Sequence, residues 1–211
     1  MPELSPIIHD PGTRLYLWKI TEPLTELESV TLTAASKVRL QSMNSVAHRK
    51  GFLAVRKLLE CAALSDEDLY YDEFGKPNLR DGRCISISHS HEFSVIAIST
   101  QKIGIDLELC RDKIINIASK FVEPGFTFAS ELSREDYIRC LTVDWGIKES
   151  IFKIRNEPGI SFKDHILVTP FELTACSTTA RLIFNGQVHH YRVYFRQVES
   201  YMLVYAFEDN V

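Results

Sequence analysis

The segment I-G-I-D-L-E-L, residues 103–109, determines how the rest of this chain is interpreted. Its aliphatic residues alternate with Gly104, Asp106 and Glu108, which is typical of a β-strand. Residues two apart share one face of a strand, so Asp106 and Glu108 point together while Ile105 and Leu107 face the core. Two adjacent carboxylates repel each other unless a cation lies between them, and such oxygen ligands suit Mg²⁺. A solvated acidic face is the other interpretation of the same pattern.

A second segment, W-G-I-K-E-S-I-F-K at residues 145–153, falls inside a helix predicted from Ser133 to about Arg155. Glu149 and Lys153 lie four residues apart on one face of that helix, with Trp145 one turn earlier. They form either an ordinary ion pair beside a buried aromatic ring, or a third metal-binding carboxylate with a lysine that neutralises a phosphate.

Two strands are predicted at residues 84–88 and 94–99, joined as a hairpin through residues 89–92. Ser88 and His89 then lie at the mouth of the loop, where a hydroxyl and an imidazole can bond phosphate oxygens. A metal site built from His89 and His91 lacks a third ligand at a matching spacing. We interpret the pair His189-His190 as structural.

A third feature is the charge of residues 29–59, which contain no Asp or Glu. A solvated helix face normally mixes the two signs, so this helical region predicts a bound polyanion, with a basic face lacking a ligand as the alternative. Lys76, in the turn Gly75-Lys76-Pro77, adds another candidate phosphate or base contact. The basic residues of the region are Lys37, Arg39, Arg49, Lys50, Arg56 and Lys57.

Composition excludes several classes of protein. The 211 residues are 45% hydrophobic and 25% charged, typical of one large or two small globular domains, and exclude disorder, collagen and coiled coil. A net charge of −4 argues against a general nucleic-acid binder. Five scattered cysteines argue against a zinc site or a disulfide framework. With neither a signal-peptide pattern nor a long apolar run, we expect a cytoplasmic protein without a membrane span.

The order of elements predicts an α+β protein made of two halves, residues 1–102 and 103–211. Each half combines helices with antiparallel strands. A helical region is expected over residues 33–63, as one helix or as two, since Asn44 and Gly51 could each mark a break. Strands are expected at 15–20 and 103–109, and a short helix at 114–122. The last third alternates like an antiparallel meander, with strands at 166–173, 180–184, 189–197 and 201–207.

Four segments, at residues 75–77, 87–90, 103–108 and 145–153, follow one another as in the 4′-phosphopantetheinyl transferases. The chain resembles the Sfp-type (surfactin-synthetase-activating) branch of this family. The last two segments match its patterns (V/I)-G-(V/I)-D and W-x-x-K-E-(A/S)-x-x-K, although Gly146 stands where the family commonly has Ser, Thr or Cys. The resemblance is strong over residues 75–153, looser over the basic region and weak over the C-terminal strands. It implies a monomer of two similar halves related by a pseudo-twofold axis, each a small antiparallel sheet packed on helices.

The resemblance also implies an activity. The 4′-phosphopantetheine arm of coenzyme A would move to a serine of an apo acyl or peptidyl carrier protein, releasing 3′,5′-ADP by a Mg²⁺-dependent in-line displacement. Asp106, Glu108 and Glu149 would bind the metal in the second half. Glu149 would help deprotonate the carrier serine, and Lys153 would stabilise the departing phosphate. Lys148 lies in the same motif with a less certain role.

The resemblance further implies contacts to coenzyme A, all but one of them in the first half. The carrier is expected to dock near residues 111–121. Two other functions stay open, a Mg²⁺-dependent phosphohydrolase of coenzyme A-like substrates and a non-catalytic relative that binds coenzyme A or carriers. Fatty-acid, polyketide and nonribosomal-peptide carriers all remain possible partners. The expected coenzyme A contacts are Lys37, Arg39, Arg49, Lys76, Ser88, His89 and Lys153.

Overall fold

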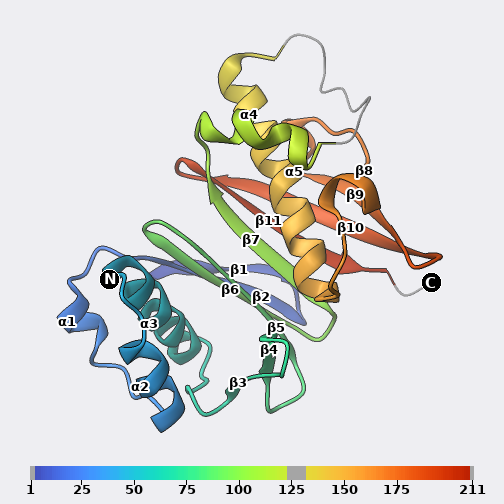
Figure 1. The fold of residues 1–211 in the computed structure, drawn as a ribbon. Coiled ribbons are helices and arrows are strands. Elements are labelled where there is room, and N and C mark those ends of the chain that lie inside the picture. The colour runs from blue at the N-terminus through green and yellow to red at the C-terminus, as the bar shows by residue number, and fades with distance from the viewer. Residues whose placement is uncertain (1–2, 123–131, 210–211) are drawn as a thin grey trace. The chain divides into compact units, whose positions relative to one another are not determined.

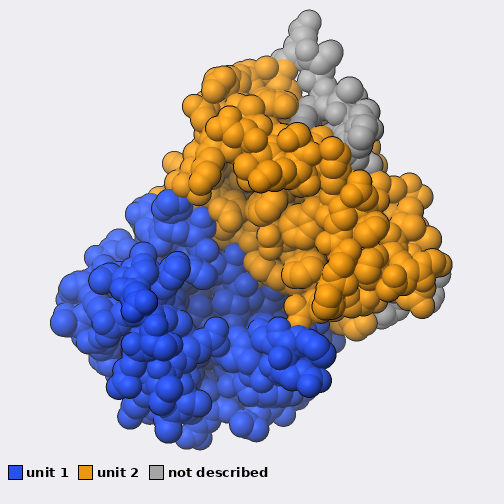
Figure 2. Space-filling view, in the orientation of Figure 1, with its two compact units in different colours: residues 1–101 blue, residues 102–211 orange. Residues whose placement is uncertain are grey.

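The computed structural model describes residues 3–122 and 132–209. The chain divides into two compact units, residues 1–101 and 102–211, which Figure 2 shows in two colours. Each unit combines helices with a small antiparallel sheet (Figure 1), so the α+β class is confirmed. The pseudo-twofold axis, and the roles given to the two halves, stay predictions.

The first unit is built on a four-stranded antiparallel sheet in the order β1-β2-β6-β5. A separate two-stranded hairpin, β3 and β4, carries the Gly75-Lys76-Pro77 turn between its strands. The strands are β1 (Glu3–Asp10), β2 (Thr13–Lys19), β3 (Leu69–Tyr71), β4 (Pro77–Leu79), β5 (Cys84–Ser90) and β6 (Phe93–Ser99).

The helical region of this unit is not one helix. Besides the short α1 (Leu24–Leu27), it forms α2 (Ala34–Gln41) and α3 (Val46–Cys61), separated at residues 42–45. Each of these two begins at a hydroxyl cap, because Thr33 and Ser45 accept hydrogen bonds from backbone N–H groups of the first turn. Gly51, the other candidate break, is buried inside α3. The apolar face of α3 packs on the sheet through Val55, Leu58 and Leu59.

The second unit is built on a five-stranded antiparallel sheet in the order β7-β11-β10-β9-β8. The strands are β7 (Ile103–Leu109), β8 (Ile166–Val168), β9 (Ser177–Phe184), β10 (Gln187–Val198) and β11 (Tyr201–Glu208). The helices are α4 (Lys113–Ile117), the 3₁₀ turn η1 (Ala118–Lys120), α5 (Arg134–Arg155), α6 (Phe162–His165) and the 3₁₀ turn η2 (Leu173–Ala175).

The long helix α5 lies on the sheet of the second unit and organises its core (Figure 1). It begins at Ser133, whose hydroxyl accepts from the Asp136 N–H, and ends at Asn156 in a left-handed conformation. Val143, Ile147 and Ile151 are fully buried against the sheet. At Gly104 the helix approaches β7 so closely that a Cβ atom would lie 1.9 Å from the Ser150 carbonyl oxygen. The glycine of the I-G-I-D segment is therefore required by packing.

Most predicted elements are confirmed, with four corrections. The hairpin loop of the first unit contains only residues 91–92, so His89 and Ser90 belong to β5. β8 ends at Val168 rather than at residue 173. The helix predicted over 114–122 is α4 followed by η1. The sequence analysis also missed the strands β1, β3 and β4, the short helices α1 and α6, and the turn η2. No helix among the described residues is long and apolar enough to cross a membrane, and all five cysteines are free thiols.

Candidate functional site

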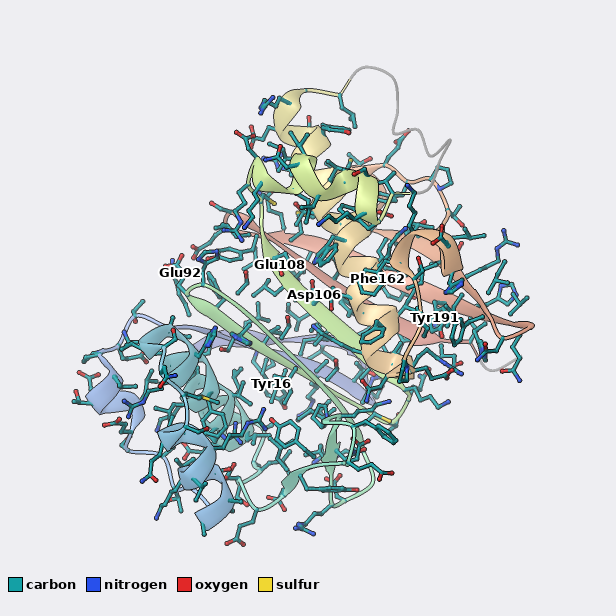
Figure 3. All side chains as sticks on the ribbon, in the orientation of Figure 1. Tyr16, Glu92, Asp106, Glu108, Phe162 and Tyr191 are labelled. Atoms are coloured by element: carbon teal, nitrogen blue, oxygen red, sulfur yellow. The ribbon has the colours of Figure 1, made fainter. Side chains whose placement is uncertain are left out.

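The segments 103–109 and 145–153 of the second unit meet where β7 runs beside α5. Asp106 is only 4% exposed and lies on the α5 side of the sheet. The Lys153 ammonium donates to Asp106 Oδ1 at 2.8 Å and to the Ile105 carbonyl at 2.9 Å. Figure 3 labels Asp106 and Glu108, which follow each other along this strand. The structure thus pairs Lys153 with Asp106, a contact across elements that helical spacing alone did not predict.

Glu149 shares the electrostatic environment of both strand carboxylates. Burial and the negative charge of Asp106 raise the pKa of Glu149 to about 7, Lys153 opposes this rise, and Glu108 adds to it. The fold therefore brings together the four side chains that the sequence analysis assigned to metal binding and catalysis. A nearby cation would stabilise the ionised form of this carboxylate.

The chemistry of these donors fits Mg²⁺. Magnesium takes one or two protein carboxylates and completes its octahedral shell with water and substrate phosphate. Asp106, Glu108 and Glu149 supply oxygen ligands of this kind, with the first two charges acting on Glu149 and Lys153 paired to Asp106. Within residues 3–122 and 132–209, no group of three or more His, Cys, Asp or Glu side chains is already arranged to hold a metal.

A small pocket of about 220 Å³ opens beside Glu108. Its walls come from the end of β7, from α4 and from α5. They combine two cations, Arg111 and Lys113, with apolar side chains that include Ile114 and Trp145. The pocket places a cationic and apolar surface next to one of the candidate metal ligands.

The neighbours of Gly146 explain why a glycine stands at this position. A Cβ atom at this position would lie 2.7 Å from Val204 Cγ2 and 3.7 Å from Asp106 Oδ2. Val204 of β11 thus fills the space that a side chain at residue 146 would need. Glycine at this position, where the family commonly has Ser, Thr or Cys, is therefore matched by the packing of Val204 against α5.

In the first unit, His89 and Ser88 point to opposite faces of β5. His89 is exposed and packs over α3, where its ring meets His48 edge-on at 6.1 Å. A Cβ atom at Gly51 would come within 3.2 Å of His89 Cδ2, so the small residue allows this approach. Ser88 is buried on the other face. The expectation that both side chains lie at a loop mouth is wrong.

The basic region is partly neutralised by acids from outside it. Arg49 pairs with Glu28 at 2.9 Å, and Arg56 is buried in an ion pair with Asp66 at 2.8 Å. The count of basic residues in 29–59 therefore overestimates the positive charge that is left to bind an anion.

Lys37 and Arg39 are both exposed residues of α2. Arg39 lies over the Tyr71 ring at 4.5 Å and lines an open pocket of about 680 Å³ that the sequence analysis did not predict. Lys76 lies in a turn fixed by Asp72, whose carboxylate accepts from the Lys76 N–H.

No family model matches the chain. Over 107 residues the chain is 32% identical to a protein of Aneurinibacillus migulanus named 4′-phosphopantetheinyl transferase gsp. The resemblance to the 4′-phosphopantetheinyl transferases is confirmed. The match covers 49% of this chain and 45% of that protein, so the chain matches about half the length of this transferase.

Proposed function

We propose that this chain is an Sfp-type 4′-phosphopantetheinyl transferase that acts on coenzyme A and an apo acyl or peptidyl carrier protein, with Mg²⁺ as cofactor. One observation carries the proposal: the Lys153–Asp106 ion pair brings the two motif segments into one cluster with Glu149. The similarity to a protein named for this activity adds independent support. A cytoplasmic location and a monomeric state belong to the proposal and stay predictions.

The proposed reaction is an in-line displacement at the β-phosphorus of coenzyme A. The carrier serine oxygen forms the new P–O bond, Glu149 takes the serine proton, and the bond to 3′,5′-ADP breaks. Asp106, Glu108 and Glu149 would hold Mg²⁺, which supplies charge neutralisation at the diphosphate. Lys153, already fixed by Asp106, would neutralise the departing phosphate.

The first unit would supply the coenzyme A contacts. Lys37 and His89 are candidates because both are exposed at the surface of this unit. Lys76 would contact the nucleotide from its Asp72-fixed turn. Arg39, Arg49 and Ser88 stay candidates as the resemblance implies, although Arg49 must exchange its Glu28 partner for a phosphate.

The carrier would dock on α4. Arg111 and Lys113 line the pocket beside Glu108 and offer cations to an acidic surface. Phe121, at the far end of the predicted docking range, is fully buried and is not available for docking. Reversing both charges (R111E and K113E) should raise the KM for the carrier; an unchanged KM would remove α4 from the interface.

The decisive experiment is intact-mass spectrometry of several apo carrier proteins after incubation with this protein, coenzyme A and Mg²⁺. We expect a gain of one phosphopantetheine that EDTA abolishes. Glu149→Gln should lose the activity by a factor of about 10² or more. Glu135→Gln on the same helix is the matched control, because Glu135 is 75% exposed and should leave the rate unchanged.

Other outcomes of this experiment have definite meanings. Coenzyme A cleaved to 3′,5′-ADP without any gain of mass on the carriers would indicate the phosphohydrolase. No change in coenzyme A or in any carrier would indicate a binding protein. Equal activity of wild type and Glu149→Gln would contradict the assignment of the cluster.

A further inference from the structure

Lys148 is the most deeply buried charged side chain of α5 that the proposed reaction does not use. Its side chain is 1% exposed, yet it carries an ammonium group with three N–H donors. Burying such a group is costly unless its donors are satisfied. We therefore expect hydrogen-bond partners around the buried Lys148 ammonium.

Two carbonyl oxygens accept hydrogen bonds from the Lys148 ammonium, and one carboxylate lies near it. The Phe121 carbonyl accepts one hydrogen bond, and the Phe162 carbonyl accepts another at 3.1 Å. The Asp144 carboxylate, one turn earlier on α5, lies 3.8 Å away and is as buried as the lysine. One side chain thus ties α5 to the segment that follows η1 and to the first residue of α6.

The two anchored residues enclose Trp145. The Phe121 ring meets the Trp145 ring at 5.2 Å and the Phe162 ring meets it at 5.4 Å. Phe121 is fully buried, so the α4–η1 segment is fixed to α5 at this end. Trp145 and α4 are walls of the pocket beside Glu108.

We propose that Lys148 is a positioning residue: it anchors the α4–η1 segment and Trp145 to α5 and thereby sets the shape of the pocket beside Glu108. The inference rests on the proposed function, because that pocket is where the carrier would dock. Loss of the anchor frees α4 rather than the metal-binding carboxylates. The KM for the carrier should therefore change far more than the KM for coenzyme A.

The first test compares Lys148→Met with Lys148→Arg, which keeps donors for the two carbonyls, and with Lys163→Met. Lys163 is the matched control, because its ammonium also donates to a carbonyl near η1, that of Ser119 at 2.9 Å, but from an exposed position. Lys148→Met should raise the carrier KM by about tenfold or more, and Lys148→Arg should recover most of it. Mere destabilisation would lower the active fraction and leave both KM values unchanged.

The second test does not depend on the activity. In a Trp18→Phe background Trp145 is the sole tryptophan, and Lys148→Met should shift its emission to the red and increase its quenching by acrylamide. If Lys148→Met does not fold, Asp144→Asn, which removes only the charge of the carboxylate 3.8 Å from the ammonium, should give a smaller shift of the same sign.

An active wild type with an unchanged carrier KM in folded Lys148→Met overturns the inference, as does unchanged Trp145 emission. If wild type modifies no carrier, the proposed function fails, and the emission of Trp145 still decides whether Lys148 is the anchor.

Discussion

Gly104 and Gly146 of the second unit have different kinds of neighbour. This difference determines how much an alanine at each position would destabilise the fold. A Cβ atom at Gly104 would collide with the Ser150 backbone, whereas one at Gly146 would collide with the Val204 side chain. Backbone in the middle of α5 cannot yield without moving the helix. A side chain can be replaced by a smaller one.

We therefore predict that Gly104→Ala lowers the free energy of unfolding by about 3 kcal/mol or more. Gly146→Ala should cost about 1–3 kcal/mol, because Val204 must shift. In the double variant Gly146→Ala/Val204→Ala the two changes should compensate, with a coupling energy of about 1–3 kcal/mol. Urea unfolding of wild type, of Gly104→Ala, of the single variants Gly146→Ala and Val204→Ala, and of the double variant gives these free energies. Strict additivity of the two single changes would show that Val204 does not fill the space at residue 146.

At this scale the sequence predicted which residues would gather but not which would pair. Alternation on a strand put Asp106 and Glu108 on one face, and helical spacing put Glu149 beside Lys153. The pairing of Lys153 with Asp106 depends on how α5 crosses β7, and no local periodicity contains that information. The two carbonyls that accept from Lys148, those of Phe121 and Phe162, lie outside α5 and were not predicted for the same reason.

Among the elements, α2 and α3 are joined by a buried polar network rather than by apolar contact alone. Asp66 accepts from the Thr33 backbone, from the Ser36 hydroxyl and from the Arg56 guanidinium. Burial alone would raise the pKa of Asp66, but these hydrogen bonds and the charge of Arg56 outweigh it and hold the pKa below its usual value. The network therefore stabilises the fold only while Asp66 is ionised.

We predict that Asp66→Asn costs about 3–5 kcal/mol of unfolding free energy at pH 7, because it leaves the Arg56 charge buried without a partner. In the unfolded chain Asp66 titrates near its usual pKa of about 3.9. The contribution is fully present above that pH and is lost as the pH falls through the lower pKa of the folded state. The difference between wild type and variant should therefore shrink below about pH 4.

Urea unfolding of both proteins from neutral to acidic pH makes this measurement. Asp81→Asn is the control, because Asp81 and its partner Arg83 are both 41% exposed and such pairs contribute little. A difference for Asp66→Asn that stays constant down to pH 3 would show that the carboxylate does not support the network by its charge.

The elements themselves were predictable where a period was long and regular. The strand at residues 103–109 and the helix ending at Arg155 have the predicted bounds within one residue. Errors arose where local signals were short or ambiguous. Asn44 and Gly51 were equal candidates for a helix break, and only the cap at Ser45 distinguishes them. The N-terminal strand β1 was missed because its residues mix Pro and charged residues with few alternating apolar ones.

Over the whole molecule, each unit has its own hydrophobic core: Val55, Leu58 and Leu59 pack on the first sheet, and Val143, Ile147 and Ile151 on the second. The α+β class followed from the order of elements, because each sheet is antiparallel and its strands are mostly neighbours in sequence. The separate cores also make the two units distinguishable in solution. Trp18 lies in the first and Trp145 in the second, and they are the two tryptophans of the chain.

We predict that the two units respond differently to Asp66→Asn, because Asp66 and its hydrogen-bond partners Thr33, Ser36 and Arg56 all belong to the first unit. Asp66→Asn provides the test, since it weakens the first unit alone. In a Trp145→Phe background, Trp18 fluorescence should report a lower urea midpoint for Asp66→Asn than for the parent. In a Trp18→Phe background, Trp145 fluorescence should report the same midpoint with and without Asp66→Asn. Equal shifts at both tryptophans would instead mean that the chain unfolds as one cooperative body, and that damage near Asp66 reaches the carboxylate cluster on β7.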